Sequence, residues 1–183
     1  MSMTALFLAV AMTPAGGMNV KVEANGLNGT FAIDPPNRIE VKGERHPRLP
    51  PPSKRPFWAK ECRFKAAYAC ECMVAWAVDQ DSVAIRAVPD GRLLARDRDY
   101  KVDPQWGGIT WLDTASISTN VPIEIDYAYR LRRIDSVVRD AQGRLAVRKG
   151  TPHVGTPAPP ALAADDTRLG NVFVDAETKS IEP

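Results

Sequence analysis

The sequence predicts an all-β protein, an antiparallel β-sandwich of the jelly-roll or immunoglobulin type with proline-rich connectors. Three observations lead to this prediction. Short runs of alternating apolar and polar residues recur along the chain, and Gly, Pro, Asn and Asp residues separate them. The 16 prolines among 183 residues gather mainly in two connectors. No stretch requires a helix longer than two turns, which favours strands throughout.

The first strands are expected between residues 18 and 42. Three runs there alternate apolar and polar side chains, at 18–23, 29–34 and 38–42. Asn25-Gly26 and the Asp34-Pro35 step lie between the runs and are typical of tight turns. Alternation places apolar side chains on one face only, so we expect antiparallel strands with one solvated face.

The first proline-rich connector is predicted at residues 43–56. It holds five prolines and is basic, with Arg45, Arg48, Lys54 and Arg55. A basic, extended arm could dock an acidic partner, but a solvated surface loop is the simpler interpretation. Residues 61–78 are ambiguous, because their alanines favour a helix and their aromatic, Cys and Val residues favour strands. The strands on either side favour the second interpretation.

The second half predicts more strands. They are expected at 82–88, 109–112, 121–129, 134–139, 144–148 and 169–174. Pro89-Asp90-Gly91 is a turn sequence, and Asp140–Gly143 is expected to close a hairpin. Pro122 is tolerated because it stands near the start of its strand. Residues 151–164 form the second proline-rich connector.

Composition limits the function classes. The formal net charge is only +2, which excludes a strongly basic nucleic-acid binder, and nucleic acid is not predicted as a partner. A spanning helix needs a run of about 18 or more apolar residues. The sequence has no such run, so no membrane span is predicted.

The N-terminal end suggests an exported protein, and the C-terminal end suggests that a further segment follows. Residues 1–17 resemble a signal peptide, with an apolar core at Ala5–Met12, Pro14 and then small residues, so cleavage is expected after Gly17. The alternatives are a first β-strand or a disordered leader, because no Lys or Arg precedes the apolar core. We therefore predict a secreted or periplasmic protein, a β-sandwich domain at 18–174, and the start of a following segment at 175–183.

The cysteines predict at most one disulfide. Cys70 and Cys72 would share one face of a strand, which strains a bond between them, so Cys62 with either one is the better pairing. A zinc site needs about four ligands. Only His46 and His153 could add to the three cysteines, and both lie in proline-rich segments. No metal site is predicted.

Two kinds of residue could carry a function. Trp106, in a glycine-rich turn, and Trp111 could stack a carbohydrate, although such a Trp more often covers the core. Asp126 and Asp135 could be a glycosidase carboxylate pair. Arginines surround both, so ion pairs on a solvated face are the preferred interpretation. No nucleophile or phosphate-loop motif is present, and we predict no catalytic residue and no cofactor in these residues.

A series of short motifs carries a family resemblance. They are Asp99–Asp103, Trp106-Gly107, Ile123–Tyr129, Arg133–Val138, Asp140–Leu145, Arg148–Pro152, Pro157–Leu162 and Arg168–Val174. In this order they resemble the non-catalytic β-region ahead of the catalytic domain in secreted bacterial SGNH/GDSL-type hydrolases. The closing half also resembles modules of phage tail-fibre or baseplate proteins.

The resemblance implies an accessory role. The chain would be the front part of an exported serine ester hydrolase and would position a downstream catalytic domain or its substrate. The alternative is a stand-alone carbohydrate-binding or tail-type structural module. In either case the matched positions are structural, and the resemblance places no catalytic residue on them.

Overall fold

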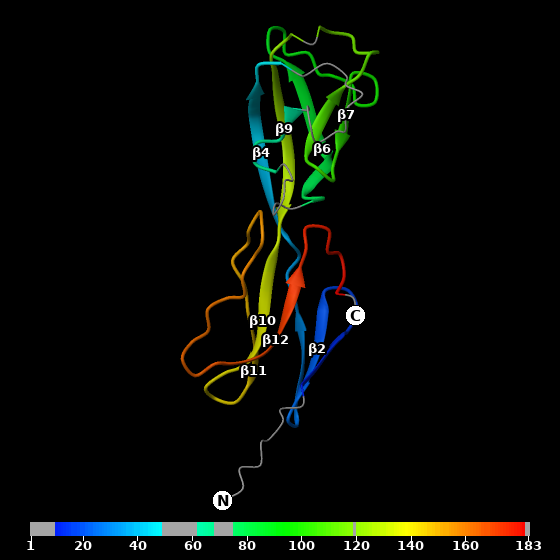
Figure 1. The fold of residues 1–183 in the computed structure, drawn as a ribbon. Coiled ribbons are helices and arrows are strands. Elements are labelled where there is room, and N and C mark those ends of the chain that lie inside the picture. The colour runs from blue at the N-terminus through cyan, green and yellow to red at the C-terminus, as the bar shows by residue number, and fades with distance from the viewer. Residues whose placement is uncertain (1–9, 49–61, 68–74, 119, 182–183) are drawn as a thin grey trace, which may run out of the picture. The chain divides into compact units, whose positions relative to one another are not determined.

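The computed structural model describes residues 10–48, 62–67, 75–118 and 120–181. Its regular elements are all strands, which form four three-stranded antiparallel sheets. The chain divides into two compact units. Unit 1 comprises residues 1–36, 132–153 and 157–183, and unit 2 comprises residues 37–131 and 154–156 (Figure 1). The predicted all-β, sandwich-like fold is confirmed. The described residues contain no helix that could cross a membrane.

Unit 1 contains two of the sheets. The first joins β1 (Val10–Pro14), β2 (Asn19–Ala24) and β3 (Leu27–Ala32) in that order. The second has β10 (Arg133–Arg139) between β11 (Leu145–Arg148) and β12 (Thr167–Val174). Asn25 and Gly26 both have positive φ, +48° and +80°, and close the predicted two-residue turn between β2 and β3.

The core of unit 1 is small and aliphatic. The alternation predicted for the strands places their apolar side chains inward. The buried cluster consists of Val20, Val22, Ile33, Val137, Val172 and Val174. Residues 175–181 also pack on this unit: Ala176 is buried, and the Ile181 N–H donates to the Gly17 carbonyl at 2.8 Å.

Unit 2 is built from the other two sheets. In the first, β9 (Ile123–Leu131) lies between β4 (Asn37–His46) and β6 (Val78–Ala87). In the second, β8 (Gly108–Trp111) lies between β5 (Cys62–Arg63) and β7 (Tyr100–Asp103). As Pro122 predicts, β9 begins directly after that residue.

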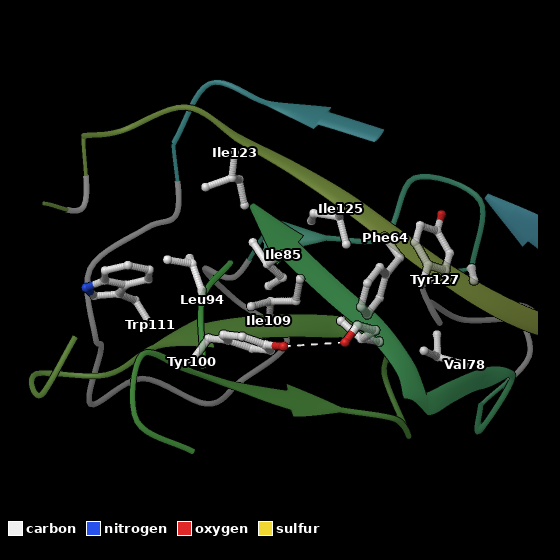
Figure 2. Close-up of a cluster of buried hydrophobic side chains, with 12 residues drawn as sticks. Phe64, Val78, Ile85, Leu94, Tyr100, Ile109, Trp111, Ile123, Ile125 and Tyr127 are labelled. Atoms are coloured by element: carbon white, nitrogen blue, oxygen red, sulfur yellow. Dashed lines mark hydrogen bonds between the residues drawn. The ribbon is translucent and has the colours of Figure 1, made fainter. Parts of the chain in front are cut away.

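The core of unit 2 is rich in aromatic side chains (Figure 2). Phe64 and Tyr127 pack with their ring centroids 4.4 Å apart. Tyr100 is buried, and its hydroxyl donates to the Val83 carbonyl at 3.5 Å. Ile85, Ile109, Ile123 and Ile125 fill the space between the rings (Figure 2).

The two predicted connectors and the ambiguous segment have different outcomes. Strand β4 continues to His46, because a bulge at Gly43 preserves its pairing with β9 into the predicted 43–56 connector. Of the ambiguous 61–78 segment, the structure describes β5, the turn at 64–67 and residues 75–78, and 68–74 lie outside the described residues. Residues 151–166 contain no strand, as expected of a connector.

The predicted signal segment overlaps the first strand. Residues 10–14 form β1 and pair with β2, which is one of the alternatives the sequence leaves open. Cleavage after Gly17 would remove β1 and the carbonyl that binds the Ile181 N–H. The signal peptide stays a prediction.

Candidate functional site

The two predicted stacking residues have different surroundings. Trp111 is only 3% exposed and belongs to the core of unit 2, so its ring offers no face to a ligand. Trp106 is half-buried in the turn between β7 and β8. Its backbone N–H donates to the Asp103 carboxylate at 3.1 Å. Of the two tryptophans, only Trp106 is partly exposed.

The two aspartates considered as a carboxylate pair, Asp126 and Asp135, belong to different units. Asp126 belongs to unit 2, where it accepts from the Gly43 N–H at 2.8 Å and from Arg86 at 2.7 Å. Asp135 belongs to unit 1 and pairs with Arg133 at 2.9 Å. The ion pairs are confirmed. The solvated face is wrong for Asp135, which is 2% exposed, because its strand turns this side chain toward the interior.

The cysteine and histidine predictions have different outcomes. Cys70 and Cys72 lie outside the described residues, as does the Cys62 side chain, so the disulfide stays a prediction. His46 is not in a loop; it ends β4 and contacts Glu44. His153 forms a bridge with Arg132. In the described part of the chain, no group of three or more His, Cys, Asp or Glu side chains could hold a metal ion.

The bulge in β4 positions a polar cluster in unit 2. Between Val41 and Glu44, strand β4 has one residue more than β9. This extra residue shifts Glu44 and His46 onto the same face as Val41, which packs against the core. Gly43 makes the bulge possible, since its φ is +63°.

Glu44 is the centre of this cluster. Its carboxylate accepts from the Tyr127 hydroxyl at 2.7 Å and the Lys65 N–H at 3.0 Å, and it contacts His46 Nε2 at 2.7 Å. Burial alone would raise the pKa of Glu44, but the bonds from His46, Lys65 and Tyr127 outweigh burial and lower it. Burial and the bond to Glu44 raise the pKa of Tyr127. The cluster therefore fixes the 64–67 turn through an ionised Glu44.

Asp99 holds loops in place at the β7 end of unit 2, as Glu44 holds the 64–67 turn. Its fully buried carboxylate accepts from the Ala95 N–H at 2.7 Å and from the Ser116 N–H at 2.9 Å. The guanidinium of Arg98, at 2.7 Å, lies beside it. The Arg98 bond and the backbone N–H donors outweigh burial and hold the pKa of Asp99 far below its usual value. Asp99 thus ties together the loops before β7 and after β8.

Unit 1 has a buried ion pair with a similar role. Arg133 and Asp135 have side chains 0% and 3% exposed, and they share one face of β10. Arg133 also donates to the carbonyls of Pro35, at 2.8 Å, and Asp34. Asp135 accepts from the Gly150 N–H at 2.9 Å. The pair therefore joins three separate segments of unit 1.

The structure also has a surface hollow, in unit 1. It measures about 420 Å³ and lies open at the turn between β2 and β3. Glu23 is the only ionisable side chain among the residues that line it. This carboxylate is already paired with Lys21 at 2.6 Å.

Sequence reasoning missed the buried roles of Glu44, Asp99 and the Arg133–Asp135 pair. Two signals could have found some of them. Gly43 interrupts an alternating run, which is typical of a bulge. The Arg-x-Asp spacing at 133–135 places two opposite charges on one face of a strand. Nothing in the local sequence distinguishes Asp99 from a surface carboxylate.

The chain matches a known protein family. A family model described as a domain of unknown function, DUF4815, matches residues 71–182, more than half of the chain. The chain belongs to the DUF4815 family. A search of curated proteins and a search of solved structures each found no match.

The DUF4815 match includes some of the polar clusters and leaves out another. Asp99, Trp106, Arg133 and Asp135 lie within the matched residues. Glu44 lies outside them, as do strands β1 to β5. In unit 2, β4 and β5 from outside the match complete sheets whose other strands lie within it. In unit 1 the β1–β2–β3 sheet lies wholly outside the match.

Proposed function

We propose that this chain is a non-catalytic β-module that holds a neighbouring domain, or that domain's substrate, in a fixed position. One observation carries the proposal: several deeply buried ionisable side chains hydrogen-bond to backbone groups and hold them in place. Glu44 fixes the 64–67 turn, Asp99 fixes two loops, and the Arg133–Asp135 pair joins three segments. Such groups give a rigid scaffold.

The electrostatics support the same role. A general acid or base works best with a pKa near the operating pH, which for a carboxyl group means a raised value. The pKa of both Glu44 and Asp99 is lowered. These carboxylates remain ionised at neutral pH and serve as permanent hydrogen-bond acceptors.

The resemblance supports a more specific form of the proposal. In that form the module is the accessory region of an exported SGNH/GDSL-type ester hydrolase and positions its catalytic domain. The partner is then a downstream domain of the same chain, and the protein is secreted or periplasmic.

A second form is a stand-alone carbohydrate-binding or tail-type structural module. The half-buried Trp106 favours carbohydrate binding, and the resemblance of the closing half to tail-fibre and baseplate modules favours a structural part. Both forms share the rigid scaffold and differ in what adjoins it.

The coding sequence after Pro183 separates the two forms. A Gly-Asp-Ser block followed later by Asp-x-x-His would identify the hydrolase form. The test then compares kcat/KM of the full-length hydrolase with that of its Asp135→Ala variant. The temperature is one at which circular dichroism shows that the substitution destabilises the module. We expect a lower kcat/KM, with Arg144→Ala, which removes an exposed ion pair, as the control. An unchanged kcat/KM would contradict the positioning role, and absence of the block would leave the second form.

A further inference from the structure

Trp76 has an unusual conformation for a large aromatic residue. Its φ is +63°, in the left-handed region that bulky L-residues rarely adopt. The residue is also 42% exposed, which is unusual for a large aromatic residue. A strained backbone persists only when its surroundings hold it, and such positions are concentrated at ligand-binding and catalytic sites.

Two backbone hydrogen bonds hold Trp76 in place. The Trp76 N–H donates to the Gln105 carbonyl at 3.1 Å. The carbonyl of the next residue, Ala77, accepts from the Arg130 N–H of β9 at 2.8 Å. Ala77 and Val78 are themselves buried. The exposed ring is therefore anchored to the core of unit 2 through its own main chain.

Trp106 follows Gln105, the residue to which Trp76 is bonded. Its turn is fixed in three ways: the Trp106 N–H binds Asp103 Oδ1 at 3.1 Å, the Gly107 N–H binds the Asp103 carbonyl at 3.0 Å, and the Phe64 N–H binds the Gly107 carbonyl at 3.0 Å. Gly107 has φ +64°, which glycine adopts without strain. An exposed tryptophan, Trp76, and a half-buried one, Trp106, thus belong to two turns joined by one backbone bond.

We propose that Trp76 and Trp106 form a carbohydrate-binding site whose ligand is a chain of β-1,4-linked pyranose rings. Such rings expose C–H groups on both faces, and these groups carry partial positive charge that is attracted to the negative face of an aromatic ring. Gln105 and Asp103, both half-buried in the same turn, supply hydrogen-bonding groups for hydroxyls. Stacked nucleic-acid bases are disfavoured, because Asp103 would repel the phosphate backbone.

This site goes beyond the positioning role, which would stand even if no saccharide bound. The test is a titration of the whole chain with cellohexaose and, separately, chitohexaose, followed by tryptophan fluorescence and by calorimetry. The variants are Trp76→Asn and Trp106→Ala. Asn tolerates the left-handed backbone, so Trp76→Asn removes the ring without adding strain. Phe173→Ala is the control, because Phe173 is a 50% exposed aromatic residue of unit 1.

We expect at least one hexasaccharide to bind, and each tryptophan variant to bind it about tenfold more weakly, as loss of one stacking ring does elsewhere. Phe173→Ala should bind like the wild type. Failure of both hexasaccharides to bind at millimolar concentration overturns the proposal, and so does unchanged affinity in Trp76→Asn. Circular dichroism checks each fold, and if Trp106→Ala does not fold, Trp76→Asn decides alone.

Discussion

The two units of this chain are both small antiparallel sandwiches, but they stabilise their interiors differently. Unit 1 buries a cluster of valines and one isoleucine and adds a fully enclosed arginine–aspartate pair. Unit 2 buries phenylalanine, tyrosine and tryptophan, and its buried carboxylates bind backbone N–H groups of turns. A core of short side chains covers less apolar surface, so polar links between segments matter more in unit 1.

This difference predicts which substitutions destabilise each unit most. Unit 1 depends on a charge pair that is costly to break, because either partner left alone is a buried, unpaired charge. Unit 2 depends on large side chains and on several separate hydrogen bonds. All four tryptophans lie within residues 37–131, so tryptophan fluorescence reports on unit 2, and amide hydrogen exchange at Val137 reports on unit 1.

The largest effect is expected for Asp135→Ala. This change leaves the guanidinium of Arg133 buried without its carboxylate, which should cost about 3–5 kcal/mol of unfolding free energy. Exchange at Val137 should accelerate strongly, and the fluorescence transition in urea should move less. The double variant Arg133→Met, Asp135→Leu removes both charges and should recover much of the lost stability. A single variant within 1 kcal/mol of wild type would refute this account of the pair.

The next effect is expected for Gly150→Ala. A Cβ at this position would lie 2.1 Å from the backbone carbonyl oxygen of Ile134, which cannot move without disturbing β10. We expect a loss of about 3 kcal/mol, measured by urea unfolding followed by circular dichroism.

Gly170→Ala is the matched control for Gly150→Ala. Its Cβ would lie 2.2 Å from Met12 Sδ, at the end of a flexible side chain that can rotate away. We expect a clearly smaller loss than at Gly150. Equal losses in the two variants would show that the backbone contact is not decisive.

A smaller effect is expected in unit 2 for Tyr127→Phe. The change removes the hydroxyl that donates to Glu44 and accepts from the Ala66 N–H, while the ring stays in the core. We expect a loss of about 1–2 kcal/mol in the fluorescence-detected urea transition. Tyr129→Phe, on the same strand, is the control and should change little. No loss in Tyr127→Phe would mean that the Glu44 cluster does not hold the 64–67 turn.

The smallest effect is an acid dependence from Asp99. Its pKa is lower in the folded state than in the unfolded state, so the unfolded state binds more protons as the pH falls. The stability that Asp99 contributes is present above the unfolded pKa and is lost as the pH falls toward the folded pKa. Between pH 7 and pH 3 we expect about 1 kcal/mol of loss from this group.

Asp99→Asn tests this dependence. The variant should be less stable at pH 7, because the amide replaces an acceptor of several hydrogen bonds, and its fluorescence-detected stability should fall less steeply with acid. A wild type and variant with parallel pH profiles would assign the acid dependence to other carboxylates.

Local sequence predicted the strands well because their signals are local. The alternation at 18–23 and 134–139, the Asn25-Gly26 turn and the position of Pro122 each act within a few residues. The candidate sites were less predictable. Trp106 stands out by its glycine-rich turn. Trp111 lies in a predicted strand, and only the packing of unit 2 shows that it belongs to the core.

The sequence by itself determined the all-β character, most strand positions and the second proline-rich connector, since periodicity and turn residues depend only on near neighbours. The tertiary structure decided which strands pair. Strand β9 pairs with β4 and β6 in unit 2, although β10, which follows it closely, pairs with β11 and β12 in unit 1. It also turned Glu44 and Asp135 inward and left Trp76 exposed. These outcomes depend on contacts between residues far apart in the chain, which an alternating pattern does not encode.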